Sequence, residues 1–173
     1  MDSNERQPRK KAKMHVGVQG IGTSKKELQF LVRHGVKHMD ASVENTEMET
    51  LLRHKEEAAR EGVSLEMIHI GLPKSITLAQ DPQRDRDIDA ICRTIENAGK
   101  AGLRGLNYNF CILDHQRTES TPGRGGSTYS TFDMSNYDNG TLTEAGRVSR
   151  EEAFERIAYF LERVIPAAEE NKV

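Results

Sequence analysis

A repeating order of short and long segments constrains the fold of this chain more than any other feature. Short apolar stretches at 15–19, 36–41, 65–72 and 103–111 each precede a longer stretch with apolar residues every three or four positions. The short stretches are typical of β-strands and the longer ones of α-helices. Strict alternation favours parallel strands joined by right-handed crossovers. We therefore expect an α/β protein with about four parallel strands.

Capping residues mark where the helices should begin. Ser24, Thr46 and Ser149 are each followed three residues later by Glu, the pattern of a capping box. Asp81 before Pro82 is typical of a cap residue followed by proline at the first helical position. Glycine in a left-handed conformation commonly ends a helix. The glycines expected to end the first three helices are Gly35, Gly62 and Gly102.

Two architectures satisfy this alternation. One is an open, doubly wound sheet, and the other is the first half of a (β/α)8 barrel, which normally needs about 250 residues. The chain has 173 residues, and periodicity alone does not choose between the two. After the fourth strand, the stretch 122–127 is rich in glycine but lacks the Gly-Lys-Ser/Thr signature of a phosphate loop. We expect it to be the tip of a β-hairpin inserted between 117–118 and 129–132.

Composition narrows the class of protein. The formal net charge of -2 predicts no overall attraction to nucleic acid or to a membrane surface. No apolar run approaches the roughly 18 residues that span a bilayer. Cys92 and Cys111 are too few for a disulfide framework, which favours a cytoplasmic location. Residues 1–13 are basic and are expected to be a disordered leader, with a nucleic-acid-binding or nuclear-import patch as the alternative. Residues 14–173 are expected to form a partial barrel domain.

Polar side chains at the strand ends are the candidates for function, because both architectures place their sites there. Asn107 and Asn109 are two residues apart on one expected strand, so they would face the same side and bind sugar hydroxyls. The alternative is that they cap a barrel layer. Arg117 is suited to clamp a carboxylate, and His115 to transfer a proton, unless both belong to a solvated loop. His34 and His38 are four residues apart, but Gly35 between them is expected to separate a helix end from a strand, so no metal ligand is assigned.

The region from 101 onward resembles a known family. Residues 101–110 read Ala-Gly-Leu-Arg-Gly-Leu-Asn-Tyr-Asn-Phe, and Asp114, Arg117-Thr118 and Thr131-Phe132-Asp133 follow. These residues, with the stretch 159–170, resemble mannonate dehydratase, whose members carry a Tyr-Asn-Phe strand end, a hairpin with glycine and a closing Phe-Asp. The first hundred residues resemble this family in layout only.

The resemblance implies a xylose-isomerase-like TIM barrel, present here as its N-terminal half. It also implies removal of water from D-mannonate to give 2-keto-3-deoxy-D-gluconate in hexuronate breakdown, with Mn²⁺ or Fe²⁺. The family's metal ligands come from the fifth strand onward, so they are expected beyond Val173. Arg117 matches a substrate-binding position. His115 and Gln116 stand where the family has Trp and Thr, and Glu119-Ser120 where it has Asp-Leu.

These observations lead to three hypotheses for the function. The first is a mannonate-dehydratase-like lyase that is inactive as this chain alone. The second is a sugar isomerase or epimerase on the same barrel. The third is a non-catalytic module that recruits a partner through an open sheet edge. Since half a barrel leaves strand edges unpaired, we expect a homo-oligomer or a complementing half-barrel, with a sugar acid as substrate and neither membrane nor nucleic acid as partner.

Overall fold

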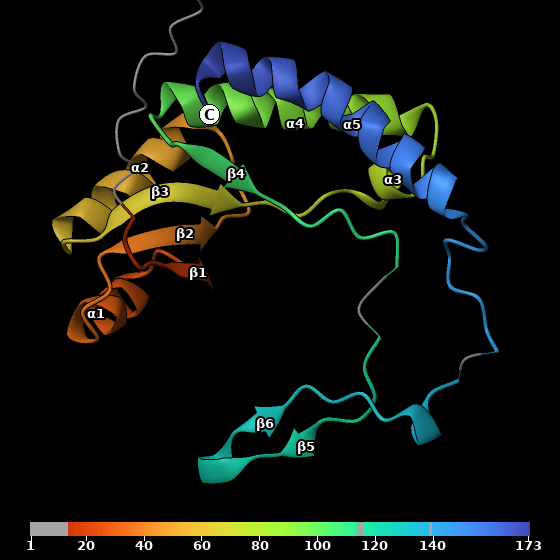
Figure 1. The fold of residues 1–173 in the computed structure, drawn as a ribbon. Helices are drawn as coiled ribbons and strands as arrows, with labels where there is room; N and C mark the ends of the chain where they lie inside the picture. Colours follow the sequence, from red (N-terminus) through yellow and green to blue (C-terminus); the bar gives the residue numbers. More distant parts are fainter. Residues whose placement is uncertain (1–13, 114–115, 139) are drawn as a thin grey trace, which may run out of the picture.

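The computed structural model describes residues 14–113, 116–138 and 140–173. Its main element is a four-stranded sheet accompanied by five helices (Figure 1). The strands of the sheet are β1 (Val18–Ile21), β2 (His38–Ser42), β3 (Ser64–His69) and β4 (Gly105–Asn107). The helices are α1 (Lys25–Arg33), α2 (Met48–Arg60), α3 (Lys74–Thr77), α4 (Gln83–Lys100) and α5 (Arg150–Asn171).

The topology of the sheet is that of a barrel segment. Neighbouring strands pair in the order β1-β2-β3-β4, and every pair is parallel. In Figure 1 the helices follow the outer side of the curved sheet. A doubly wound sheet would break the sequential strand order and carry helices on both faces, whereas a barrel keeps consecutive strands adjacent and its helices outside. The predicted parallel (β/α) units are confirmed.

An aliphatic core fills the space between the helices and the sheet. Met39 and Ala41 of β2 and Leu65 and Ile68 of β3 are all at most 3% exposed. Since successive strand residues point to opposite faces, polar residues such as Asp40 point to the other side of the sheet. The helices contribute most of the remaining buried residues: Leu28, Leu31, Leu51, Ala58, Ile76, Ile88, Ile91, Ile95, Ala98, Phe160 and Val164.

Two of the four predicted helix caps form. Ser24 and Ser149 each make both bonds of a capping box with the glutamate three residues later. The caps predicted at Thr46 and Asp81 were wrong, since neither α2 nor α4 has a side-chain cap bond. The Thr46 hydroxyl instead contacts the Thr94 hydroxyl at 2.9 Å, and an arginine of α4 binds the Asp81 carboxylate. A tertiary partner has taken the Thr46 side chain from the cap bond, and a local ion pair with Arg84 has taken that of Asp81.

The strands and helices also differ from expectation in extent. β4 pairs with β3 only over Gly105–Asn107, because β3 itself ends at His69. The apolar run to residue 111 therefore continues past the end of the sheet, and Asn109 lies beyond the strand. The short helix α3 was not predicted. The glycines after α1, α2 and α4 adopt φ of 75°, 83° and 68°, as left-handed helix ends require.

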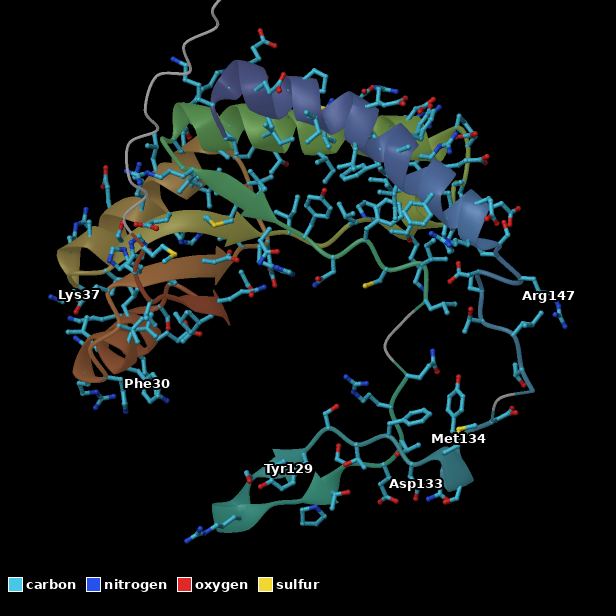
Figure 2. The ribbon with its side chains drawn as sticks, in the orientation of Figure 1. Phe30, Lys37, Tyr129, Asp133, Met134 and Arg147 are labelled. Carbon is cyan, nitrogen blue, oxygen red and sulfur yellow. The ribbon has the colours of Figure 1, made fainter. Side chains whose placement is uncertain are left out.

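The hairpin predicted after the fourth strand is present. β5 (Thr121–Pro122) and β6 (Thr128–Tyr129) pair antiparallel around the 3-10 turn Arg124–Gly126, and a second 3-10 turn spans Met134–Asn136. This segment projects away from the sheet as an arm, and Figure 2 shows Tyr129, Asp133 and Met134 on it. Within the described ranges, no helix combines the length and apolar character needed to cross a membrane.

Candidate functional site

A hollow of about 300 Å³ lies on the side of the sheet opposite the helices. In a closed barrel this side faces the interior, where side chains from neighbouring strands meet. All four strands or the segment before them contribute to it. Its polar lining comprises His15, Gln19, His38, Asp40, Glu66 and Asn107.

Asp40 and Asn107 form the best-defined polar contact in this hollow. The Asn107 amide Nδ2 donates a 2.8 Å hydrogen bond to Asp40 Oδ2, which reaches across β3 between the two flanking strands. Asp40 is 9% exposed, and its Oδ1 has no hydrogen-bond partner in the described part of the chain. A buried carboxylate oxygen without a donor is costly unless a ligand or water supplies one. Asp40 Oδ1 is therefore an acceptor available to a hydroxyl group.

The structure brings only one of the predicted site residues into the hollow. Asn107 lines it, whereas Asn109 is exposed beyond the end of β4. Arg117 is exposed at the base of the hairpin arm, where its Nε donates to Ser130 Oγ at 2.6 Å and its Nη1 to the Gln116 carbonyl at 2.9 Å. Both of these contacts lie within the segment that carries Arg117. His115 lies outside the described residues.

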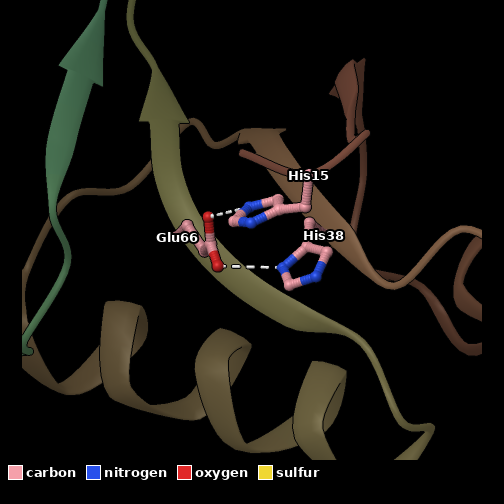
Figure 3. A group of neighbouring side chains, drawn as sticks. All are labelled: His15, His38 and Glu66. Carbon is pink, nitrogen blue, oxygen red and sulfur yellow. Dashed lines mark hydrogen bonds and ion pairs between the residues drawn. The ribbon is translucent and has the colours of Figure 1, made fainter. Parts of the chain in front are cut away.

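A second polar cluster lines the same hollow, nearer the amino-terminal ends of the strands. His15 precedes β1, His38 is the first residue of β2, and Glu66 is the third residue of β3. His15 Nε2 and His38 Nδ1 each lie 2.9 Å from a different oxygen of Glu66, as Figure 3 shows. The two imidazole rings stack with centroids 3.5 Å apart. Their donor atoms and the Glu66 carboxylate lie within 4.8 Å of one another, so these residues are able to hold a metal ion.

The charge state of Glu66 follows from its neighbours. Partial burial of the carboxyl opposes ionisation, but hydrogen bonds from His15 and His38 outweigh it, so the pKa of Glu66 is lowered. Glu66 is therefore ionised at neutral pH. Sequence reasoning missed this cluster because its members lie 23 and 28 positions apart (38 minus 15, 66 minus 38) on three segments. Only strand register brings them together.

Comparison with known proteins identifies the family. The model of the D-mannonate dehydratase (UxuA) family matches residues 13–147. This chain belongs to the D-mannonate dehydratase family. The match includes all four strands of the sheet, the Asp40–Asn107 pair and Arg117, so the predicted resemblance is confirmed and extends to the first hundred residues.

Individual mannonate dehydratases agree with the family match. The chain is 30% identical over 162 residues to the Thermotoga neapolitana protein, covering 73% of this chain and 44% of that protein. It is 27% identical over 159 residues to the Shouchella clausii protein, with the same coverage. A crystal structure of mannonate dehydratase from Streptococcus suis serotype 2 superposes with a TM-score of 0.74 at 23% identity, covering 92% of this chain and 52% of that one. The chain thus spans about half the length of the mannonate dehydratases that it matches.

Proposed function

We propose that this chain provides the first half of a mannonate dehydratase barrel and, when completed, takes part in converting D-mannonate to 2-keto-3-deoxy-D-gluconate in hexuronate breakdown. The observation that carries this proposal is the Asp40–Asn107 pair on the inner face of a barrel segment from this family. One buried carboxylate oxygen without a partner and one fixed amide form a site suited to the hydroxyls of a sugar acid.

The reaction makes specific demands on the protein. Elimination of water removes the proton beside the substrate carboxylate, which is only weakly acidic, and negative charge develops on the carboxylate oxygens. The bound divalent metal implied by the family, Mn²⁺ or Fe²⁺, would supply the positive charge that stabilises it. In this chain, Asp40 and Asn107 would orient hydroxyl groups, and Arg117 would bind the carboxylate through paired hydrogen bonds. Asn109 and His115 remain proposals as a further hydroxyl contact and a proton donor or acceptor.

The His15–His38–Glu66 cluster has donors that fit a divalent metal and lines the same hollow as Asp40 and Asn107. It lies nearer the amino-terminal ends of the strands, whereas Asn107 ends β4. Catalytic groups of barrels gather at the carboxyl ends. We therefore keep the proposal that the metal of the dehydratase reaction binds residues from the later strands of the family's barrel.

The chain by itself is expected to lack dehydratase activity, because it spans only about half the length of the mannonate dehydratases that it matches. Purified protein incubated with D-mannonate and Mn²⁺ should form no 2-keto-3-deoxy-D-gluconate above the level of a buffer control. Manganese-dependent product formation by this chain alone would contradict the expectation that it needs a completing partner. Turnover of ketoses in place of mannonate would favour a sugar isomerase.

Substrate binding tests the proposed role of the inner face directly. Saturation-transfer NMR with D-mannonate should detect weak binding to the wild-type chain and a clear loss of signal in Asn107→Ala. Arg117→Ala should weaken binding if the arm closes over the hollow. Arg124→Ala, an arginine at the exposed hairpin tip, is the matched control and should bind like wild type. Equal signals in Asn107→Ala and wild type would remove the support for a sugar-acid site.

A further inference from the structure

We propose that His15, His38 and Glu66 form a binding site for a first-row divalent transition metal, with Zn²⁺ as the best-fitting ion. It shares the hollow with Asp40 and Asn107 but uses other residues, and the proposal is independent of the proposed function. It would be a structural site that fastens the segment before β1 to the sheet.

The donor set is the first argument. Two imidazole nitrogens and one carboxylate are the ligands that zinc takes in several three-ligand protein sites, and other first-row metals accept the same set. Calcium and magnesium prefer all-oxygen sites. The Glu66 carboxylate adds an anionic donor to the two imidazoles, which favours a cation over a neutral ligand. The chemistry therefore selects transition metals.

The distances are the second argument. Ligand atoms about 2.1 Å from one zinc ion at tetrahedral angles stand roughly 3.4 Å apart. In this chain the two nitrogen–oxygen contacts are 2.9 Å, and one ligand atom from each of the three residues lies within 4.8 Å of the other two. The hydrogen-bonded cluster is thus close to a coordination geometry.

The third argument is that a bulge in the pairing of β2 and β3 brings this cluster together. Met39 pairs with Leu65 and Asp40 pairs with Met67, so Glu66 is an extra residue without a partner in β2. Bulges of this kind redirect a side chain, and they are enriched beside functional sites. Here the bulge places Glu66 beside His38, its hydrogen-bond partner.

The segment before β1 also packs closely against the start of β2. An added Cβ on Gly17 would lie 3.0 Å from the His38 carbonyl oxygen, which is too close for an ordinary contact. Glycine at this position lets the chain run directly over the start of β2. His15 can then stack on the His38 ring. The backbone thus brings all three donors together from segments far apart in sequence.

Metal titration of the full chain tests this proposal. Isothermal calorimetry with Zn²⁺ should show saturable binding of one ion per chain, and Co²⁺ should give the visible absorption bands of a low-symmetry site with nitrogen and oxygen ligands. His15→Ala and Glu66→Gln should each weaken binding at least tenfold and abolish those bands. His15 is exposed and precedes β1, so its replacement does not threaten the core. Zinc should raise the melting temperature of wild type but not of His15→Ala.

A histidine outside the cluster provides the control. His34→Ala removes an exposed imidazole whose Nδ1 contacts the Phe30 carbonyl oxygen of α1, and this variant should bind metal like wild type. Two results would overturn the proposal. One is the lack of saturable binding at millimolar metal, which would leave a hydrogen-bonded His–Glu–His cluster. The other is wild-type affinity in both His15→Ala and Glu66→Gln, which would place the metal elsewhere, for example on the cysteines.

Discussion

Phe160 shows how one aromatic residue secures the longest helix. Its side chain on α5 is 1% exposed, and its ring centroid lies 5.3 Å from that of Tyr108 and 5.7 Å from that of Phe110. Edge-on and tilted aromatic pairs at these distances add to the burial of apolar area. Tyr108 and Phe110 follow β4, so Phe160 connects α5 to the end of the sheet that carries Asn107.

Replacing Phe160 should therefore unfold the chain more easily than replacing an aromatic residue on the solvent side of the same helix. Phe160→Ala is expected to lower the free energy of unfolding by about 3–5 kcal/mol, since it leaves a cavity in the core. Phe154 is 59% exposed, and Phe154→Ala should change stability by less than about 1 kcal/mol. Urea unfolding followed by circular dichroism measures both. Similar losses in the two variants would show that α5 does not pack through Phe160.

The sequence predicted a role for some site residues and not for others. Asn107 was predicted from its place on the fourth expected strand, and it lines the hollow. Its partner Asp40 is 67 positions away, and only the pairing of β2, β3 and β4 reveals the bond between them. Asn109 was expected on the same strand, but β4 is too short to include it. Residue type indicated which side chains were candidates for the site, and strand register decided which of them line the hollow.

At the scale of elements, the helix starts test how far local sequence decides structure. The capping boxes at Ser24 and Ser149 depend only on a serine and on a glutamate three residues later, so local pattern was sufficient. Thr46 fits the same pattern but lies near α4, and its hydroxyl bonds there instead. A cap is predictable where no tertiary partner competes for its side chain.

The box at Ser24 makes the stability of the chain depend on pH. The Glu27 carboxylate accepts a hydrogen bond from the Ser24 hydroxyl, and this bond lowers the pKa of Glu27. Slight burial of the carboxyl opposes this shift, and backbone hydrogen bonds from Ser24 and Gly22 add to it. The stabilisation is therefore complete above the unfolded pKa of about 4.3 and is lost as pH falls through the lower folded value.

Glu27→Gln should destabilise the chain at neutral pH, and the difference from wild type should shrink as pH falls below about 4. Urea unfolding at pH 7 and near pH 3 provides the measurement. Glu44→Gln, at an exposed loop position, is the control and should show no comparable change between the two pH values. A Glu27→Gln deficit that stays constant with pH would mean that the carboxylate charge does not stabilise α1.

At the scale of the whole molecule, the barrel segment exposes surfaces that invite association. β1 and β4 lie at the two edges of the sheet, and each leaves one row of backbone hydrogen-bonding groups outside the sheet. The arm exposes further apolar side chains, with Tyr129, Phe132 and Met134 about half exposed or more. A closed barrel would cover the edges, so a second copy or a complementing half-barrel is the expected partner.

We therefore expect the isolated chain to self-associate. Size-exclusion chromatography with light scattering should give a mass above the 19.5 kDa of one chain, and the mass should rise with concentration. Lys substitutions in the exposed edge strand β1 should reduce association, because charged edges resist strand pairing. A sharp monomer peak with cooperative thermal melting would contradict this expectation.

The sequence by itself determined the order of the strands and of the four longer helices, the hairpin after β4, two helix caps and the family resemblance. These depend on periodicity and on short motifs, which are local properties of a chain. Periodicity did not choose between a barrel segment and an open sheet; the family resemblance implied the barrel, and the strand order of the structure confirmed it. The Asp40–Asn107 pair and the His15–His38–Glu66 cluster came only with the tertiary structure. Each depends on which strands pair and in which register, including the bulge at Glu66. Contacts between segments far apart in the chain produce no regular spacing of residues by which the sequence could predict them.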